Sequence, residues 1–198
     1  MASILVSVTS FDLMRRVFAR FRYGLAAAVL LGPGVYCAQA APGKYLEVDE
    51  FLSQALTSAP ETPEVLFVDA DLRERIESIL GHRLSLLRMR YWQDSDTTVW
   101  VLDEIGKTEP ITIGVAVEAG RVKSVRVLEF RESRGYEVRY PFFTDQYSGA
   151  ALDDGNGIDR SIDSITGATL SVNAVNKVVR VALLCDAKIR APGQLAGL

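Results

Sequence analysis

The feature that most constrains the fold is a run of alternating apolar residues across residues 84–130. In LSLLRMRYW, TTVWVLDE, PITIGVAVE and RVKSVRVLEF the apolar side chains follow the period of two expected of a strand with one buried face. The short connections Gln93–Asp96 and Ala119–Gly120 favour hairpins between neighbouring segments. The apolar face of the third segment consists of Ile111, Ile113, Val115 and Val117. Four strands in meander order therefore predict an antiparallel sheet.

Two helical segments precede these strands. DEFLSQAL carries apolar residues at helical spacing, and Pro60 and Pro63 stop the helix after it. In the second segment Asp69 or Asp71 is suited to cap the first turn, and Gly81 suits a left-handed end. Its apolar stripe consists of Leu72, Ile76, Ile79 and Leu80. We expect the two helices to form a packing subdomain.

A third helix is expected over residues 171–188, where the apolar residues form one stripe. The stripe consists of Val172, Val175, Val179, Ala182 and Leu183. Before it, residues 131–162 are rich in glycine, aspartate and aromatic residues and lack periodicity, and long loops of this kind are usually functional. The elements together predict an α+β fold, an antiparallel β-sheet packed by helices, with an N-terminal helical section.

Residues 1–40 have the pattern of a cleaved secretory signal peptide. A basic cluster that starts at Met14 is followed by an apolar stretch and the small-x-small site Ala38–Ala40. A retained membrane anchor is the alternative, but residues 32–34, Gly-Pro-Gly, interrupt an apolar stretch shorter than the roughly 20 residues of a span. A lipidated Cys37 is disfavoured by the bulky residues before it. We expect a protein that is periplasmic or otherwise exported and soluble after cleavage, by either the general or the twin-arginine route.

Composition narrows the classes of function. The 198 residues are 48% hydrophobic and 24% charged, which fits a globular domain with a core. A formal net charge of −3 argues against nucleic acid as a partner. With Cys37 in the predicted leader, Cys185 is the one cysteine of the mature sequence, so we expect no internal disulfide and interpret Cys185 as a buried small hydrophobe.

The segment DSITGATLS, residues 163–171, lies just before the last predicted helix. A helix N-terminus offers unpaired N–H groups and the positive end of the helix dipole, which suit a phosphate. Gly167 and Ala168 let a bulky group approach the backbone, and Thr169 supplies a hydroxyl to which a phosphate could be bound or joined. The alternative is that Thr169 or Ser171 merely caps the helix.

The same segment resembles the flavinylation motif of the FMN-binding domain family, which reads Asp, two variable residues, Ser or Thr, Gly, Ala, Thr. This family includes the C subunit of the sodium-pumping NADH:quinone oxidoreductase and the G subunit of the related electron-transport complex. The resemblance implies covalent FMN on Thr169 through a phosphoester, installed by a flavin transferase that uses FAD and magnesium. It gives Asp163 a role in positioning or activating Thr169, or only in capping the loop. The cofactor-binding residues that it implies here are Asp163, Thr166, Gly167, Ala168, Thr169, Leu170 and Ser171.

A second match lies upstream, where residues 106–138 resemble the family's two strands closed by a Glu-x-x-Gly turn. Glu132 and Gly135 stand at the turn positions, which the resemblance places near the isoalloxazine ring. Arg134 replaces a usual proline, and Glu137 stands where a second glycine is common. Aromatic residues that either frame the ring or pack the loop are Tyr136, Tyr140, Phe142, Phe143 and Tyr147. The predicted boundaries are 41–100 for the N-terminal helical and first-strand section, 101–190 for the FMN-binding domain and 191–198 for a tail.

Three other signals are interpreted as structural. Gly106–Thr108 is similar to the end of a phosphate-binding P-loop, but it lacks the strand-to-helix context and predicts a strand connection. Residues 153–159, DDGNGID, predict a turn rather than a calcium loop, because the glycine of such a loop is replaced by Asp159. His82 follows a helix-ending glycine and lacks partners for a metal site, so it is expected at a helix end or the surface.

The sequence thus predicts an exported FMN-binding flavoprotein that relays electrons between redox partners outside the cytoplasm. It is expected to be a carrier, without catalytic residues or a metal, rather than a substrate-converting enzyme. The expected partners are a flavin transferase and a redox protein such as a membrane reductase or a cytochrome. One alternative is a module that binds FMN or another phosphorylated ligand reversibly, as a sensor. A second is a structural envelope protein whose helix cap mimics the motif.

Overall fold

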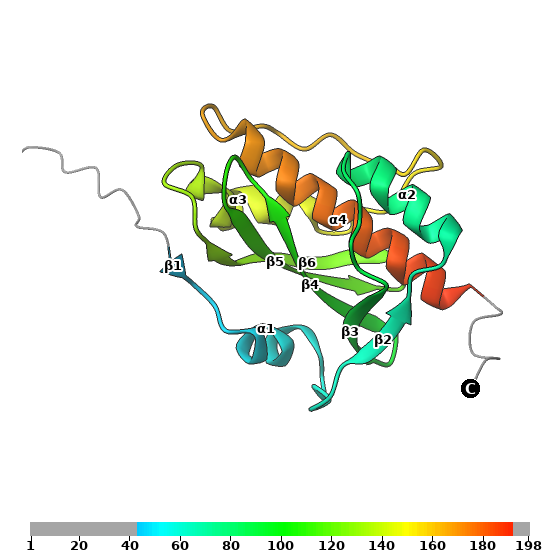
Figure 1. Cartoon of the computed structure of the whole chain (residues 1–198). Coiled ribbons are helices and arrows are strands. Elements are labelled where there is room, and N and C mark those ends of the chain that lie inside the picture. Colours follow the sequence, from blue (N-terminus) through cyan, green and yellow to red (C-terminus); the bar gives the residue numbers. More distant parts are fainter. Residues whose placement is uncertain (1–42, 192–198) are drawn as a thin grey trace, which may run out of the picture. The chain divides into compact units, whose positions relative to one another are not determined.

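The computed structural model describes residues 43–191, so the predicted signal peptide lies outside the described residues. A six-stranded antiparallel sheet in the order β1-β6-β5-β4-β3-β2 forms its centre (Figure 1). The strands are β1 (Gly43–Lys44), β2 (Glu64–Phe67), β3 (Arg88–Asp94), β4 (Thr97–Ile105), β5 (Pro110–Glu118) and β6 (Arg121–Phe130). The helices are α1 (Val48–Ala55), α2 (Ala70–Leu80), α3 (Pro141–Thr144) and α4 (Thr169–Arg190), with 3₁₀ turns η1 (Tyr136–Arg139) and η2 (Asp145–Tyr147). The predicted α+β class is confirmed.

The four-stranded meander is also confirmed, with each strand antiparallel to the next. The β5–β6 hairpin closes tightly because Ala119 and Gly120 both adopt positive φ, 50° and 78°. The first predicted strand begins later than expected, at Arg88. The carbonyl oxygens of Leu84 and Leu86 instead accept hydrogen bonds from the Arg73 guanidinium of α2, at 2.8 and 3.3 Å.

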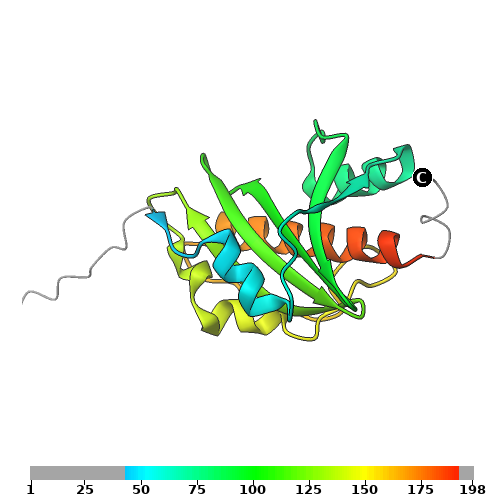
Figure 2. The same cartoon turned by 90° about the horizontal axis from the view of Figure 1, so that it is seen from below.

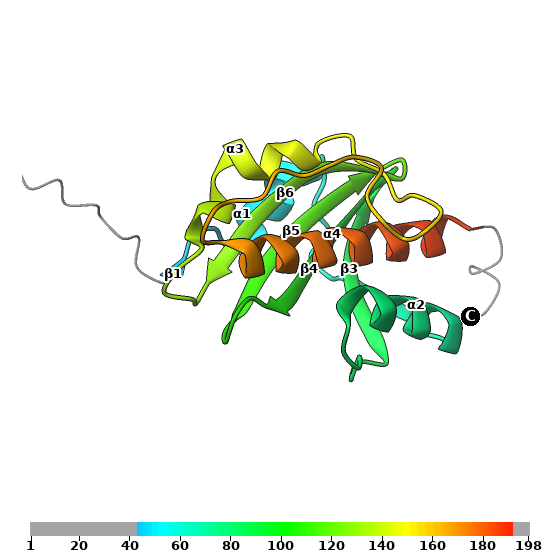
Figure 3. The same cartoon turned by 90° about the horizontal axis from the view of Figure 1, so that it is seen from above.

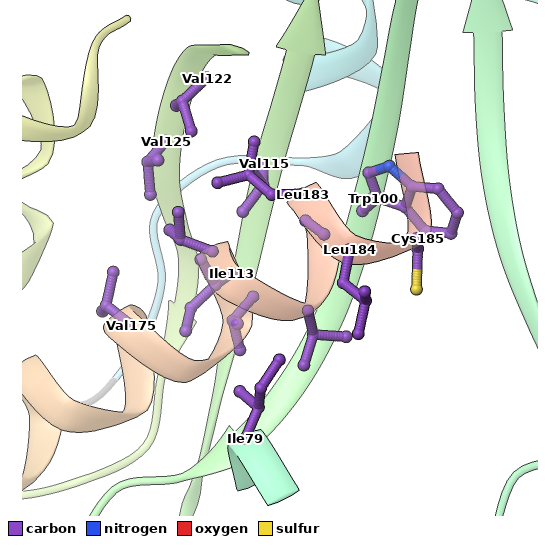
Figure 4. Packing of buried hydrophobic residues seen from close by; sticks show 14 of the residues in the cluster. Ile79, Trp100, Ile113, Val115, Val122, Val125, Val175, Leu183, Leu184 and Cys185 are labelled. Carbon is purple, nitrogen blue, oxygen red and sulfur yellow. The ribbon is translucent and has the colours of Figure 1, made fainter. Parts of the chain in front are cut away.

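One face of the sheet carries the main core. Helix α4 lies across this face with α2 beside it (Figure 3). Figure 4 shows Leu183 of α4 near Ile113 and Val115 of β5, all of them buried in one cluster. Burial of a side chain of this size stabilises the fold by about 1.5–3 kcal/mol. The stripe that was predicted for α4 therefore attaches the helix to the sheet along its length.

Helices α1 and α2 do not form the packing subdomain that we expected. Helix α1 packs on the opposite face of the sheet, where Phe51 and Leu52 form a second cluster with Val99, Ala116 and Leu128. The sequence between the two helices forms β2, a strand that the periodicity did not reveal because it has only four residues. Crossing the sheet edge through β2 carries the chain from one face to the other.

The ends of α2 are as predicted. Asp69 is its N-cap, and the side chain accepts a hydrogen bond from the Leu72 N–H at 2.9 Å. Gly81 ends the helix with φ 73°, in the left-handed region. Asp69 also forms an ion pair with Lys188 at 2.7 Å, so the start of α2 is tied to the end of α4.

A buried carboxylate joins α4 to β4. Asp186 is fully buried and accepts hydrogen bonds from the Thr98 hydroxyl and from Arg190 Nε, both at 2.7 Å. The Thr98 oxygen accepts in turn from Trp100 Nε1 at 3.0 Å. Because each polar group in this series of hydrogen bonds has a partner, the negative charge of Asp186 is tolerated in the core. Among residues 43–191, no helix combines the length and hydrophobicity needed to span a bilayer.

Gly114 permits the contact between α1 and the sheet, and this contact can be tested. A Cβ at this position would lie 2.5 Å from Cε1 of the Phe51 ring. We predict that Gly114→Ala lowers the free energy of unfolding, measured in urea, by about 1–3 kcal/mol through overpacking. In a Phe51→Ala background the same change should cost much less, because the ring is gone. An equal cost in both backgrounds would show that Phe51 is not the cause.

Candidate functional site

The DSITGATLS segment folds into a turn that leads directly into α4. The Ala168 N–H donates to the Ile165 carbonyl at 2.9 Å, and Gly167 inside this turn has φ 85°. Apart from Gly167 and its two neighbours in the chain, no atom of the described residues lies within 4 Å of the position that a Cβ would take on Gly167. Glycine is therefore favoured here by backbone conformation, and the space beside it stays open.

Thr169 is the first residue of α4 and is exposed. Its hydroxyl forms no hydrogen bond with any residue of the described range 43–191. Ala168 occupies the N-cap position, and no side chain of residues 43–191 caps this helix. The alternative that Thr169 or Ser171 caps α4 is therefore wrong. Within the described part of the chain the first N–H groups of the helix have no acceptor, which is the condition in which a helix N-terminus binds an anion.

A groove of about 660 Å³ opens beside Thr169. Its size falls in the usual range of ligand sites. It is lined by Lys107, Glu132, Ser133, Arg134, Gly167, Ala168, Thr169, Leu170 and Ser171. The structure thus brings together two segments that are separated in sequence, the turn after β6 and the start of α4. Six of the nine residues predicted from the sequence line this groove.

Gly135, the seventh, packs directly against the first turn of α4. A Cβ on Gly135 would lie 2.4 Å from Ser171 Oγ and 3.5 Å from Ala168 Cβ, and its φ is 87°. Both steric room and backbone conformation therefore require glycine here. This contact fixes the position of the turn after β6 relative to Thr169.

The structure does not place Asp163 or Thr166 among the residues that line the groove. The backbone N–H of Asp163 donates to the side-chain oxygen of Gln146 at 2.8 Å, which attaches this part of the loop to η2. The Asp163 carboxylate is exposed and makes no hydrogen bond within residues 43–191. Its predicted alternative role as a loop cap therefore receives no support from a hydrogen bond.

Glu132 is buried, and its carboxylate holds the β4–β5 turn. Oε1 accepts the backbone N–H groups of Lys107 (2.5 Å), Thr108 (2.6 Å) and Glu109 (2.9 Å). Oε2 accepts the Thr108 hydroxyl at 3.2 Å. Burial acts to raise the pKa of Glu132, but these backbone and hydroxyl donors outweigh it, and the pKa lies below its ordinary value. Glu132 thus fixes the wall of the groove.

Sequence reasoning missed three groove residues, Ser133 and the two cations Lys107 and Arg134. Both cations are exposed, and neither forms an ion pair within the described range. The Gly106–Thr108 segment is a strand connection, as predicted, but its lysine lies at the groove. Two features of the sequence could have pointed to these residues. One is the similarity of Gly106–Thr108 to a phosphate-binding loop, and the other is the arginine at position 134, where the related motif usually has proline. Two cations beside a helix N-terminus make the groove electrostatically suited to an anion.

None of the five aromatic residues after β6 lines this groove. Phe143 and Tyr147 are fully buried, and the Tyr147 hydroxyl donates to Asn176 of α4 at 2.6 Å. Burial raises the pKa of Tyr147. Tyr136 and Tyr140 flank the Arg139 guanidinium, which lies 5.5 and 4.7 Å from their ring centroids. These contacts, with Phe142 stacked on Tyr140, favour the interpretation that the aromatic residues pack the loop.

The other sequence signals have structural roles. His82 is half exposed after α2, and its Nε2 lies 3.1 Å from the buried carboxylate of Glu104, which also binds Lys177 at 3.0 Å. Residues 153–159 form a turn in which the Asp153 carboxylate accepts two backbone N–H groups. Cys185 is fully buried, and burial together with nearby Asp186 raises its pKa to about 12, as expected of a small core residue.

Comparison with known proteins agrees with this geometry. Residues 106–184 match the family model of the FMN-binding domain, so this part of the chain belongs to that family. The match spans β5, β6, the loop and most of α4, and it includes the whole DSITGATLS segment. The search of curated proteins returned no match. The chain therefore contains an FMN-binding domain, and the predicted family is confirmed.

The role of Glu132 in the groove wall predicts a dependence of stability on pH. Because its folded-state pKa lies below the ordinary 4.5, its contribution is present above that value and is lost as pH falls through the folded-state pKa. We predict that Glu132→Gln lowers the free energy of unfolding at pH 7 by about 1–3 kcal/mol. The variant should also show a flatter loss of stability between pH 7 and 3.

The matched control is Glu74→Gln on α2, whose exposed carboxylate forms no hydrogen bond within residues 43–191. It should leave both the stability at pH 7 and the shape of the pH profile nearly unchanged. If Glu132→Gln behaved like Glu74→Gln, the hydrogen bonds to Glu132 would not be stabilising the turn.

Proposed function

We propose that this protein carries FMN covalently on Thr169, through a phosphoester, and relays electrons between redox partners outside the cytoplasm. The observation that carries the proposal is the Thr169 hydroxyl. This hydroxyl is exposed beside a groove of the size of a ligand site, at a helix N-terminus that no side chain of the described range caps. It forms no hydrogen bond with any described residue.

The residues of the groove fit the phosphate end of the cofactor. A phosphoryl group on Thr169 Oγ1 would lie at the positive end of α4, within reach of N–H groups that lack an acceptor. Lys107 and Arg134 add positive charge from the other wall. Gly167 leaves the approach to the backbone open. When bound, the flavin supplies one- and two-electron chemistry, while the protein supplies attachment and electrostatics.

The attachment step requires Thr169 to act as a nucleophile. In transfer from FAD, the hydroxyl oxygen bonds to the phosphorus of the FMN half, the phosphoanhydride bond breaks, AMP leaves and the hydroxyl loses its proton. The resemblance to the family assigns this step to a transferase with magnesium. Since Asp163 does not line the groove, we propose that it acts on Thr169 only when the transferase holds the exposed loop.

A covalent link suits an exported carrier. Outside the cytoplasm free flavin is dilute, so a cofactor held only by reversible contacts would be lost. The predicted signal peptide of residues 1–40 supports export, and the family supports FMN as the cofactor. The redox partner is proposed to be a membrane reductase or a cytochrome.

Substitution of Thr169 tests the attachment. Protein produced together with a flavin transferase should gain the mass of one FMN less water on the peptide that contains Thr169. We predict that Thr169→Ala abolishes this added mass and the flavin fluorescence of the denatured protein. The free energy of unfolding should change by less than about 0.5 kcal/mol, because the hydroxyl makes no hydrogen bond within residues 43–191.

Thr169→Ser is the conservative control, because it retains a hydroxyl at the same position and should accept some flavin. Covalent flavin that persists in Thr169→Ala would show that the attachment site is wrong. Flavin that binds the native protein but is removed completely by denaturation would instead identify a reversible FMN-binding module.

A further inference from the structure

The outer edge of β2 is an open edge of the sheet. Strand β2 is the last in the strand order and pairs only with β3 within residues 43–191. The Val68 N–H donates to the Leu87 carbonyl at 3.0 Å, so in this antiparallel pair the even-numbered residues of β2 face β3. The N–H and C=O groups of Val65 and Phe67 therefore point away from the sheet. Such an edge is a template for another strand.

Exposed apolar side chains surround this edge. Val65 is 44% exposed, Phe67 66%, Leu86 53% and Leu87 70%. In Figure 2, α1 covers the middle strands of the sheet, whereas β2 and β3 extend beyond the helix and are not covered by it. A hollow of about 460 Å³ lies here, lined by Val65, Ser85, Leu86, Leu87, Arg88 and Arg90. Apolar patches of this kind on a surface mark sites of interaction.

Two arginines give the patch a positive charge. Arg88 pairs with Phe67 and Arg90 with Val65 in the β2–β3 register, so all four side chains lie on the same face of the sheet. Neither guanidinium forms an ion pair or a hydrogen bond with another residue of the described range. A ligand of this surface therefore has two cations available for bidentate pairing with carboxylates.

We propose that this edge binds an extended, acidic segment of a partner protein, which adds to the sheet beside β2 as a seventh strand. The backbone of the segment pairs with the outward groups of Val65 and Phe67. Because side chains alternate along a strand, every second residue of the segment lies on the face of Arg88, Arg90 and the hollow. These residues include both carboxylates, which pair with the two arginines, and apolar groups, which enter the hollow. The proposal is independent of flavin attachment, because none of these residues lines the groove beside Thr169.

The same observations disfavour two other occupants. A lipid surface would satisfy the apolar and cationic side chains but would leave the edge N–H and C=O groups of Val65 and Phe67 without partners. A second copy of the protein could pair with the edge through its own β2, but its β3 would then add a second Arg88 and Arg90 to the joined sheet. Like charges at an interface disfavour that arrangement. An acidic strand satisfies the backbone, the apolar hollow and the charge together.

The test uses the full mature chain and a fluorescein-labelled, end-capped peptide of nine residues. Its odd-numbered residues are alternately glutamate and valine, and its even-numbered residues are threonine, so that one face of the strand carries both carboxylates and apolar groups. Binding is measured by fluorescence anisotropy. We expect saturable binding that weakens about tenfold or more in Arg88→Gln and again in Arg90→Gln, the scale of one lost charged hydrogen bond. A lysine-for-glutamate peptide and a peptide N-methylated at alternate residues should bind much more weakly.

Hydrogen exchange gives a second readout that does not depend on the variants. The amides of Val65 and Phe67 should exchange quickly in the free protein and slowly with the peptide, whereas Leu66, which already faces β3, should change little. The proposal is overturned if the peptide fails to bind or if the lysine peptide binds equally well. It is also overturned if only vesicles with anionic phosphatidylglycerol bind the arginine patch, or if the peptide-free protein is a dimer with these amides protected.

Discussion

The packing of α4 across the sheet is the constraint on which the rest of the structure depends. Its buried stripe lies on β4 and β5, and the buried Asp186 joins it to Thr98 of β4. Lys188 ties it to α2 through Asp69. A helix held in this way along 22 residues has no freedom to slide, so the position of its first residue, Thr169, is set by contacts far from it.

The groove exists because two further contacts bring distant segments to the start of α4. Gly135 allows the turn after β6 to touch Ser171, and Glu132 in the same turn collects three backbone N–H groups of the β4–β5 connection. Glu132 is thus more a part of the scaffold than a ligand contact. The carboxylate is held in its charged form by donors that the turn itself provides, so among the described residues Lys107 and Arg134 are the groove charges without an ion pair.

The start of α4 departs from the usual rules for helix ends, and the departure coincides with the site. A strong capping residue would satisfy the first N–H groups, yet Ala168 stands at the N-cap. The hydroxyl of Thr169 remains exposed. Functional sites commonly depart from the local rules of helix capping, because a bound ligand can supply the hydrogen-bond partners that the protein does not. The open edge of β2 is a second departure, because exposed strand edges are normally blocked by charge, proline or a covering element.

The sequence by itself determined most of the longer elements and the DSITGATLS motif. Period-two patterning predicted β5 and β6 with their observed bounds, and helical stripes and caps predicted α2 and α4, because these signals are local. Only the tertiary structure decided that α1 and α2 lie on opposite faces, that β2 forms the edge, and that Lys107 and Arg134 meet at Thr169. Those outcomes depend on which surfaces of distant elements pack together, and a four-residue strand or a single lysine carries no periodic signal of its own. The role of Glu132 also emerged only in three dimensions, since its partners lie more than twenty residues away in the chain.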